Sequence, residues 1–461
     1  MSSVAPPGLS LPATLRLGLF QACLGCLAVI FAGLLNRVML SELAFPGLLV
    51  GGALACEQFV APARVLFGQV SDSHPIAARH RVPYILLGTA LFCVLAVVSI
   101  PLIFHVGHLL AVGAPAERGV GIAALCGVFA LYGLAISLAS TPYLALVIDR
   151  TDEKQRPRAV GIIWCMLTVG IVIGAIMISV SLRSLDGVSD PSILEPTLLR
   201  FMATVAATVM ALTIVATWGM ESASTSPSDS AREDSVTLKQ AWRLITSSRQ
   251  VLIFFSFLIL FTLGLFLQDP VLESYGAQVF GMPIAATAQL NAFWGVGTLI
   301  GLLMAGLWIV PRLGKLPTAR LGCQLIAASL LLLLLCGLTH SIPLLQVVML
   351  LFGLAAGIGT NSALCLMLDL TLPQAAGTFV GVWGLAQALS RALGKLIGGG
   401  LFDLAGILPL GSGPYPRFAL VFGIELLVAL GALHVLGRVN VRQFKEDTGR
   451  SLGRVLAMDI G

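Results

Sequence analysis

The feature that most limits what this chain can fold into is a series of long apolar stretches that hold almost no charged side chains. Only 11% of the 461 residues are charged and 57% are hydrophobic, whereas soluble domains carry about 25% charged residues. A helical crossing of a bilayer needs about 20 apolar residues, and a helix satisfies its own backbone hydrogen bonds there. We therefore expect an all-α integral membrane protein with twelve transmembrane helices, near residues 14–35, 45–70, 82–104, 120–148, 159–182, 198–219, 250–268, 284–310, 318–339, 342–369, 376–402 and 417–437.

Basic residues are unevenly divided between the segments that join these predicted helices. If the N-terminus is cytoplasmic, 19 of the 27 Lys and Arg residues lie on the cytoplasmic side and five lie on the opposite side. Cytoplasmic loops of membrane proteins carry an excess of Lys and Arg. The sequence thus predicts a multi-pass protein of a bacterial inner membrane with both termini in the cytoplasm. The net charge of +5 follows from this topology, and we expect membrane lipid but no nucleic acid as a partner.

The middle of the chain predicts that the twelve helices form two halves. Residues 221–235 are rich in Ser, Thr, Pro and charge, and a short amphipathic stretch follows from Leu238 to Thr246. The predicted parts are an N-terminal six-helix half (1–220), a cytoplasmic linker with the amphipathic segment (221–249), a C-terminal six-helix half (250–437) and a cytoplasmic tail (438–461).

Similar residues recur at equivalent places in the two halves. Asp149 and Asp369 end the fourth and tenth predicted helices, and a glycine follows each of them twelve residues later, Gly161 and Gly381 respectively. Such a repeat is typical of two halves related by an axis along the membrane normal. We therefore expect a major-facilitator-like arrangement.

The segment after the second predicted helix resembles the signature of the major facilitator superfamily. A Gly-x-x-x-Asp sequence is followed by Arg-His-Arg, so that a small residue allows close helix packing and an acidic residue faces nearby cations or a helix N-terminus. The residues expected to form this gating motif are Gly68, Asp72, Arg79, Arg81, Asp149 and Arg150. The second-half copy has Val310 at the acidic position, and a generic charged turn remains the alternative.

Several charged or polar residues fall inside or beside the predicted helices, where charges are costly and face an interior or a cavity. Glu57 and Arg64 are seven residues apart, and Arg391 and Lys395 are four apart, so each pair is predicted to share a helix face. Two neighbouring cations need an anionic partner, and the candidates are Asp369, Asp403, Glu425 or an acidic ligand group. The full set of buried-charge or cavity candidates is Arg37, Glu57, Arg64, Asp269, Glu273, Asp369, Gln387, Arg391, Lys395 and Glu425. Structural ion pairing and a substrate or gating role both stay open.

Arg37 and Asp269 occupy equivalent positions, each near the outer end of the first helix of its half. Because their charges are opposite, we hypothesise a salt bridge between the halves that holds the outer side closed.

Sequence motifs for bond-making chemistry are missing. The chain has no Walker motif, no Gly-x-Ser-x-Gly elbow and no His-Glu-x-x-His sequence, which are the usual signals of nucleotide, acyl-transfer or zinc chemistry. We therefore expect a protein that is not an enzyme, with no catalytic residue, metal or nucleotide.

Several longer segments, taken together, resemble the PucC/LhaA group, which is also called the bacteriochlorophyll delivery family. They cover most of the chain, and the overall length is most similar to the PucC members from purple photosynthetic bacteria. The matching segments are Leu35-Asn-Arg-Val-Met-Leu-Ser-Glu42, Ala61-Pro-Ala-Arg64, Arg81-Val-Pro-Tyr84, Thr141-Pro-Tyr143, Gln268-Asp-Pro-Val-Leu-Glu273 and Gly381-Val-Trp-Gly384, the last followed by Gln387 and Arg391.

The resemblance implies a major-facilitator-like accessory protein of the intracytoplasmic photosynthetic membrane. It implies a role in the assembly and high-level expression of the peripheral light-harvesting antenna complex, with bacteriochlorophyll as possible bound cargo. Antenna polypeptides and proteins of bacteriochlorophyll synthesis are the implied partners. The alternatives are a proton-coupled small-solute transporter of the major facilitator type and a signalling protein that affects antenna gene expression indirectly.

Overall fold

The computed structural model describes residues 9–76, 79–151, 156–185, 188, 190–221, 249–369, 376–409 and 411–440. The amphipathic stretch predicted from Leu238 to Thr246 and nearly all of the predicted tail lie outside these residues. So do the side chains of Asp72 and Asp369, although both residues lie in described helices.

The described chain is helical nearly throughout. The helices of its first part are α1 (Leu11–Val29), α2 (Gly47–Phe59), α3 (Ala63–Ser73), α4 (Val82–Val112), α5 (Pro115–Arg150), α6 (Arg156–Ser181) and α7 (Pro191–Thr217). The second part has α9 (Arg249–Phe266), α10 (Leu272–Phe280), α11 (Ile284–Met304), α12 (Val310–Leu313), α13 (Lys315–Cys336), α14 (Ile342–Asp369), α15 (Ala376–Ile407) and α16 (Tyr415–Leu436). Shorter segments are the π-helices η1 (Ile30–Leu35), η2 (Val38–Glu42) and η5 (Ala305–Ile309), and the 3₁₀ turn η3 (Arg183–Leu185).

Ten helices among the described residues are long and apolar enough to cross a membrane, which identifies a multi-pass membrane protein. The second predicted crossing forms two shorter helices instead. α2 ends at Phe59 and α3 begins at Ala63, and Pro62, which lacks a backbone donor, stands at the break. The eleventh predicted crossing corresponds to α15, which is 32 residues long and carries Arg391 and Lys395.

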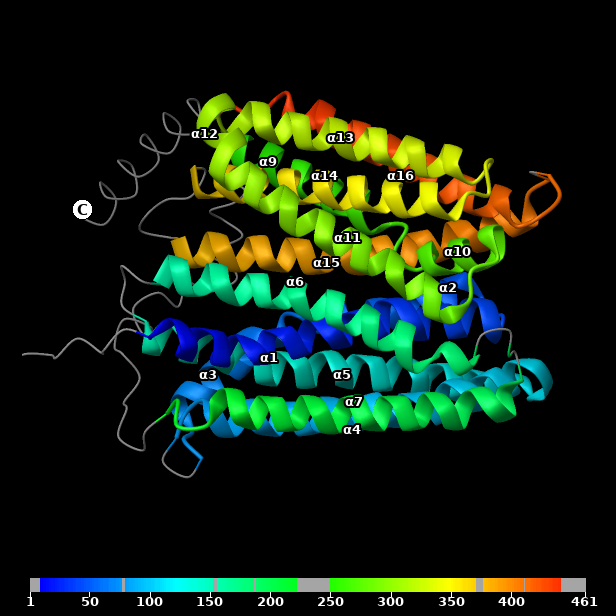
Figure 1. Cartoon of the computed structure of the whole chain (residues 1–461), viewed down its shortest axis with the longest axis horizontal. Coiled ribbons are helices and arrows are strands. Elements are labelled where there is room, and N and C mark those ends of the chain that lie inside the picture. The colour runs from blue at the N-terminus through cyan, green and yellow to red at the C-terminus, as the bar shows by residue number, and fades with distance from the viewer. Residues whose placement is uncertain are drawn as a thin grey trace, which may run out of the picture.

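The elements gather by their order in the chain (Figure 1). Helices α1 to α7 pack among themselves, as do α9 to α16, and the two groups meet where α2 packs against α15 and where α6 packs against α11. We call the α2–α15 contact the seam. Small residues bring its backbones close together, because a Cβ atom on Gly399 would overlap the carbonyl oxygen of Gly47. Close backbone approach of this kind is typical of helices in lipid.

The break after α2 changes which neighbour the chain contacts. α2 packs against both α15 and α5, whereas α3 packs against α5, and Figure 1 shows α2 and α3 at opposite ends of the bundle. The end that holds α3 and α12 is called the inner end here, and the end that holds α2 and α10 is called the outer end.

Three tryptophans with exposed side chains mark the inner end. Trp164 lies in the first turns of α6, Trp218 directly follows α7, and Trp308 lies just before α12. Tryptophan is enriched where a membrane meets water, so these exposed indoles are suited to the boundary between hydrocarbon and headgroups.

Candidate functional site

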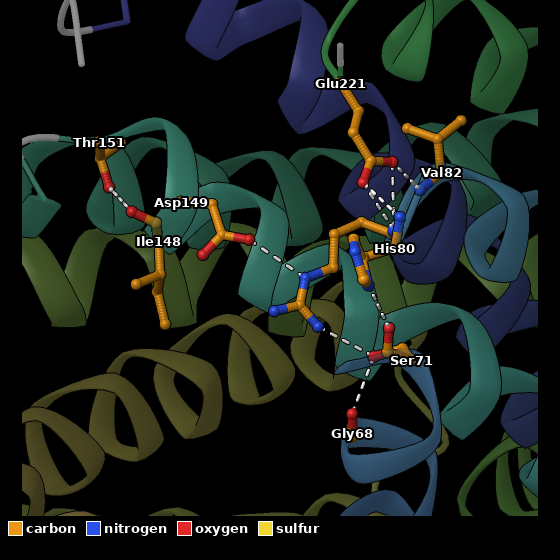
Figure 2. Close-up of polar contacts among 9 residues, drawn as sticks. Gly68, Ser71, His80, Val82, Ile148, Asp149, Thr151 and Glu221 are labelled. Atoms are coloured by element: carbon orange, nitrogen blue, oxygen red, sulfur yellow. Dashed lines mark hydrogen bonds and ion pairs between the residues drawn. The ribbon is translucent and has the colours of Figure 1, made fainter. Parts of the chain in front are cut away.

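The signature residues belong to a polar cluster at the inner end, which is built on three helices (Figure 2). The guanidinium of Arg81 donates to Asp149 Oδ2 at 3.1 Å and to Ser71 Oγ at 2.9 Å. Ser71 Oγ in turn donates to the carbonyl of Gly68 at 2.9 Å. Arg81 therefore ties the end of α3 to the end of α5, across the start of α4.

Glu221 completes this inner cluster from the opposite direction. Its carboxylate accepts hydrogen bonds from three consecutive backbone N–H groups, those of His80 at 2.6 Å, Arg81 at 3.0 and 3.1 Å, and Val82 at 2.7 Å (Figure 2). These donors stand at the N-terminus of α4, where backbone N–H groups lack partners in the helix and the helix dipole favours an anion. The first linker residue thus caps α4.

The structure brings together Gly68, Arg81 and Asp149 from the predicted gating motif. Asp72 lies in the last turn of α3, Arg79 is exposed in the turn before α4, and Arg150 is the half-buried last residue of α5. Sequence reasoning missed Ser71 and the capping role of Glu221. Only the position of Glu221, directly after a predicted helix and before a polar linker, could have suggested it.

A second polar cluster lies at the outer end, between the two groups of helices. Arg37 is only 5% exposed, and its guanidinium donates to Thr287 Oγ1 at 2.6 Å and contacts Glu42 Oε1 at 3.4 Å. The preceding residue, Asn36, donates from its amide to the backbone carbonyl of Asp269 at 2.9 Å. The Arg37–Thr287 and Asn36–Asp269 bonds both cross between the two groups of helices.

The prediction of an Arg37–Asp269 salt bridge is therefore wrong, because each of the two side chains contacts a different residue. The carboxylate of Asp269 pairs instead with Lys395 Nζ at 3.6 Å, within the second group of helices. Asp269 lies in the turn after α9, where its backbone carbonyl accepts from Asn36, just beyond η1, while its side chain remains available to α15.

Glu273 lies next to the π-helical end of the first crossing. Asn291 of α11 donates to Glu273 Oε1, and a side chain at Gly33 would overlap the same carboxylate oxygen. Gly33 thus leaves the space that Glu273 occupies. Departures from α-helical winding are common at functional sites, and here η1 and η2 flank Asn36 and Arg37, which contact the second group of helices.

The cations of α15 have different surroundings. Lys395 is 6% exposed and has Asp269 as its anionic partner in place of the predicted candidates Asp403 and Glu425, whereas the side chain of Asp369 lies outside the described residues. Arg391 lies with its guanidinium over the ring of Phe266, 4.6 Å from the ring centroid, a favourable cation–π arrangement. Gln387, one turn before Arg391, is half-buried.

The remaining candidates are separated. Glu57 is half-buried near the end of α2 and accepts from Gln58 Nε2 at 3.2 Å, whereas Arg64 is exposed in α3, beyond the helix break. They do not share one continuous helix face as predicted, because the chain leaves the helix at residues 60–62. Glu425 is fully buried in α16, where its Oε1 lies 3.4 Å from the backbone nitrogen of Gln268.

Hydrogen bonds between the two groups of helices gather at the outer end in the part of the chain that is described. Besides the Asn36 and Arg37 bonds, Gln289 donates to Ser179 at 3.0 Å and Gln278 donates to Ser41 at 3.3 Å. The outer end is thus held together by polar contacts. No three His, Cys, Asp or Glu side chains among the described residues converge as metal ligands.

This helical arrangement is shared with solved transporters. The chain superimposes on a D-xylose–proton symporter with a TM-score of 0.67, over 91% of this chain and 96% of the symporter, at 14% identity. The fold is therefore that of the major-facilitator-like membrane transporters.

Sequence comparison identifies the particular family. The family model described as PUCC protein matches residues 34–444, so the chain belongs to the PucC family. It is 30% identical over 452 residues to protein PucC of Rhodobacter capsulatus, covering 94% of this chain and 93% of the relative. It is also 31% identical over 447 residues to the bacteriochlorophyll synthase 44.5 kDa chain of the same species, covering 93% of this chain and 95% of the relative.

Proposed function

We propose that this protein is an accessory factor, rather than an enzyme, that holds bacteriochlorophyll in the photosynthetic membrane and delivers it to polypeptides of the peripheral light-harvesting antenna during assembly. The observation that carries the proposal is membership of the PucC family over residues 34–444. A relative that covers almost the whole chain bears a name from bacteriochlorophyll synthesis. Antenna polypeptides, and enzymes that finish the pigment, are the proposed partners.

The proposed topology has twelve crossings in two six-helix halves, with both termini in the cytoplasm of an intracytoplasmic membrane. It adds the α2–α3 pair and α15 to the ten helices that meet the criteria of length and apolarity. The excess of Lys and Arg in the segments predicted to be cytoplasmic supports this orientation. The halves are residues 1–220 and 250–437, joined by the linker 221–249 and followed by the tail 438–461.

Pigment chemistry fits a membrane-embedded carrier. Bacteriochlorophyll is a large amphiphile with a long apolar tail, so it partitions into lipid and needs no aqueous route. The glycines at 394–400 are an unsuitable docking face, however, because Gly398 contacts the carbonyl of Leu267 and Gly399 contacts Gly47. These glycines serve helix packing, and the pigment must contact other residues of the bundle.

The test uses the full chain, gently solubilised from cells that make pigment. We expect pigment absorbance and antenna polypeptides to co-purify with the protein, and both to disappear from a mock purification of the untagged strain. In a deletion strain whose antenna genes are driven by a foreign promoter, antenna complexes should still fail to accumulate although the transcripts are normal. Normal accumulation there would support the indirect signalling role instead.

A proton-coupled small-solute transporter is the second candidate. The likeness to a symporter fold and the charged residues beside the seam, Glu57, Arg391 and Lys395, favour it. Uptake of a solute into proteoliposomes driven by a pH gradient, by protein that carries no pigment, would decide for this alternative.

A further inference from the structure

A row of hydrogen-bond donors follows one face of α15. Trp383, Gln387 and Arg391 stand four residues apart, so their side chains project from the same side of the helix. The opposite side carries Leu389 and Leu393, which are 37% and 41% exposed and therefore face lipid. The polar row thus faces the interior of the bundle.

Two of these donors have no acceptor among the described residues. Trp383 Nε1 and Arg391 Nε are both buried without a hydrogen-bond partner. An unsatisfied buried donor is rare in folded proteins and calls for an explanation. Both atoms can only donate, so the group that would satisfy them is an acceptor.

The charge of Arg391 also lacks a direct partner in the described structure. Asp269, the nearby carboxylate, is held by Lys395 at 3.6 Å, and Glu57 and Arg64 act on Arg391 only at longer range. The planar face of the guanidinium instead lies over Phe266. This arrangement leaves the edge of the guanidinium free for an acceptor beside an aromatic ring.

All three side chains of the row are half-buried as whole residues, whereas the two unpaired nitrogens themselves are covered by protein atoms. The donors lie closer to the inner end than the Gly47–Gly399 contact does. Helix α2 packs against α15 at the outer end and ends at Phe59. The following helix, α3, packs against α5. The side of α15 that carries the row therefore extends past the tightly packed part of the seam.

We propose that Trp383, Gln387 and Arg391 form a donor row that binds the ring carbonyl oxygens of a flat, membrane-embedded amphiphile. The inference rests on the proposed function and adds to it the chemical group that the protein recognises. Hydrogen bonds from the row orient the ring, and Phe266 lies beside it as an aromatic neighbour.

The experiment uses the full-length protein in lipid nanodiscs, with bacteriochlorophyll as the probe, and records the carbonyl stretching bands by resonance Raman spectroscopy. A carbonyl that accepts a hydrogen bond vibrates at a lower frequency than a free one. We expect at least one lowered carbonyl band with the wild-type protein and its return to the free position in Trp383→Phe or Arg391→Met. Trp164→Phe, which changes an exposed tryptophan of α6, is the matched control and should leave the bands unchanged.

Affinity provides the second measurement. Loss of one donor should weaken pigment binding roughly tenfold, the equivalent of one hydrogen bond, and Gln387→Leu should act in the same direction. A chlorin ester without ring carbonyls should bind the wild-type protein about equally weakly. This comparison needs no variant, so it remains decisive if a substitution prevents folding.

The outcomes separate the two proposals. If wild-type protein binds no pigment at all, the proposed function is wrong. If it binds pigment, but the carbonyl bands stay at the free position or are the same in all variants, the donor row is wrong while the carrier function stands. Equal affinity for pigment and for the carbonyl-free chlorin would overturn the donor row by itself.

Discussion

Asp403, in the last turns of α15, caps the first turn of α2 from the other half of the molecule. Its two carboxylate oxygens accept from the backbone N–H groups of Gly47 at 2.6 Å and Leu48 at 2.7 Å. A carboxylate at a helix N-terminus satisfies free donors and matches the helix dipole. This contact therefore joins the halves at the outer end of the seam.

Replacing Asp403 by Ala should loosen the outer end. Loss of a helix cap costs about 0.5–2 kcal/mol, which thermal unfolding in detergent can detect, and spin labels on the outer ends of α2 and α15 should show a broader distance distribution. The control is Asp190→Ala, which removes the cap of α7 within one half, where Asp190 accepts from Ser192 N at 2.9 Å. Equal broadening in both variants would show that Asp403 does not act across the seam.

The close contact between Gly47 and Gly399 should make position 399 intolerant of a side chain. Gly399→Ala places a methyl group against the carbonyl of Gly47, and such overpacking costs about 1–3 kcal/mol. Gly384→Ala, on the same helix but with nothing within 4 Å of a Cβ atom, should leave the melting temperature nearly unchanged. Equal melting temperatures for the two alanine variants would contradict the close packing at Gly399.

Removing the carboxyl of Glu221 should destabilise the first half. Glu221→Ala leaves three N–H groups at the start of α4 without their acceptor, at a cost of about 1–3 kcal/mol, whereas Glu221→Gln keeps one acceptor oxygen and should lose less. Glu117→Ala serves as the control, since Glu117 accepts only from the nearby Ala114 N at 2.9 Å. Thermal melts of the purified variants measure all three, and a Glu221→Ala protein as stable as Glu117→Ala would contradict the cap.

The Lys395–Asp269 pair should behave as a coupled unit. Lys395→Met leaves the carboxylate of Asp269 without its cation, and we expect a loss of about 1–3 kcal/mol, less than the roughly 3–5 kcal/mol of a fully buried pair, because the Asp269 side chain is 27% exposed. The double variant Lys395→Met/Asp269→Asn should recover part of that loss. Strictly additive losses in the double-mutant cycle would show that the two side chains do not interact.

The sequence predicted the multi-pass helical fold because the length and apolarity of a crossing are properties of one segment. Polar contacts depend on how segments pack, and they were harder to predict. The opposite charges of Arg37 and Asp269 suggested a salt bridge. In the structure, however, Asn36 donates to the backbone carbonyl of Asp269, and the Asp269 carboxylate pairs with Lys395. Glu221 was invisible as a cap because its three donors lie about 140 residues earlier in the chain.

The interruption of the second crossing was also partly visible. A single crossing was predicted over residues 45–70, although Pro62 lies within it, whereas the structure ends α2 at Phe59 and begins α3 at Ala63. A proline removes one backbone hydrogen bond, but whether a helix bends or stops is decided by what its two parts pack against. Here both parts pack against α5, and α2 packs against α15 as well.

The interruption at residues 60–62 is a possible hinge, because the segments on its two sides are held by different parts of the molecule. One segment is fastened to the opposite half by Asp403 and the paired glycines, and the other segment belongs to its own half. If the two groups of helices rock against each other, the backbone turns at residues 60–62. The contacts between α2 and α15 at the outer end then stay intact. The molecule can then widen at its inner end while the outer end stays closed.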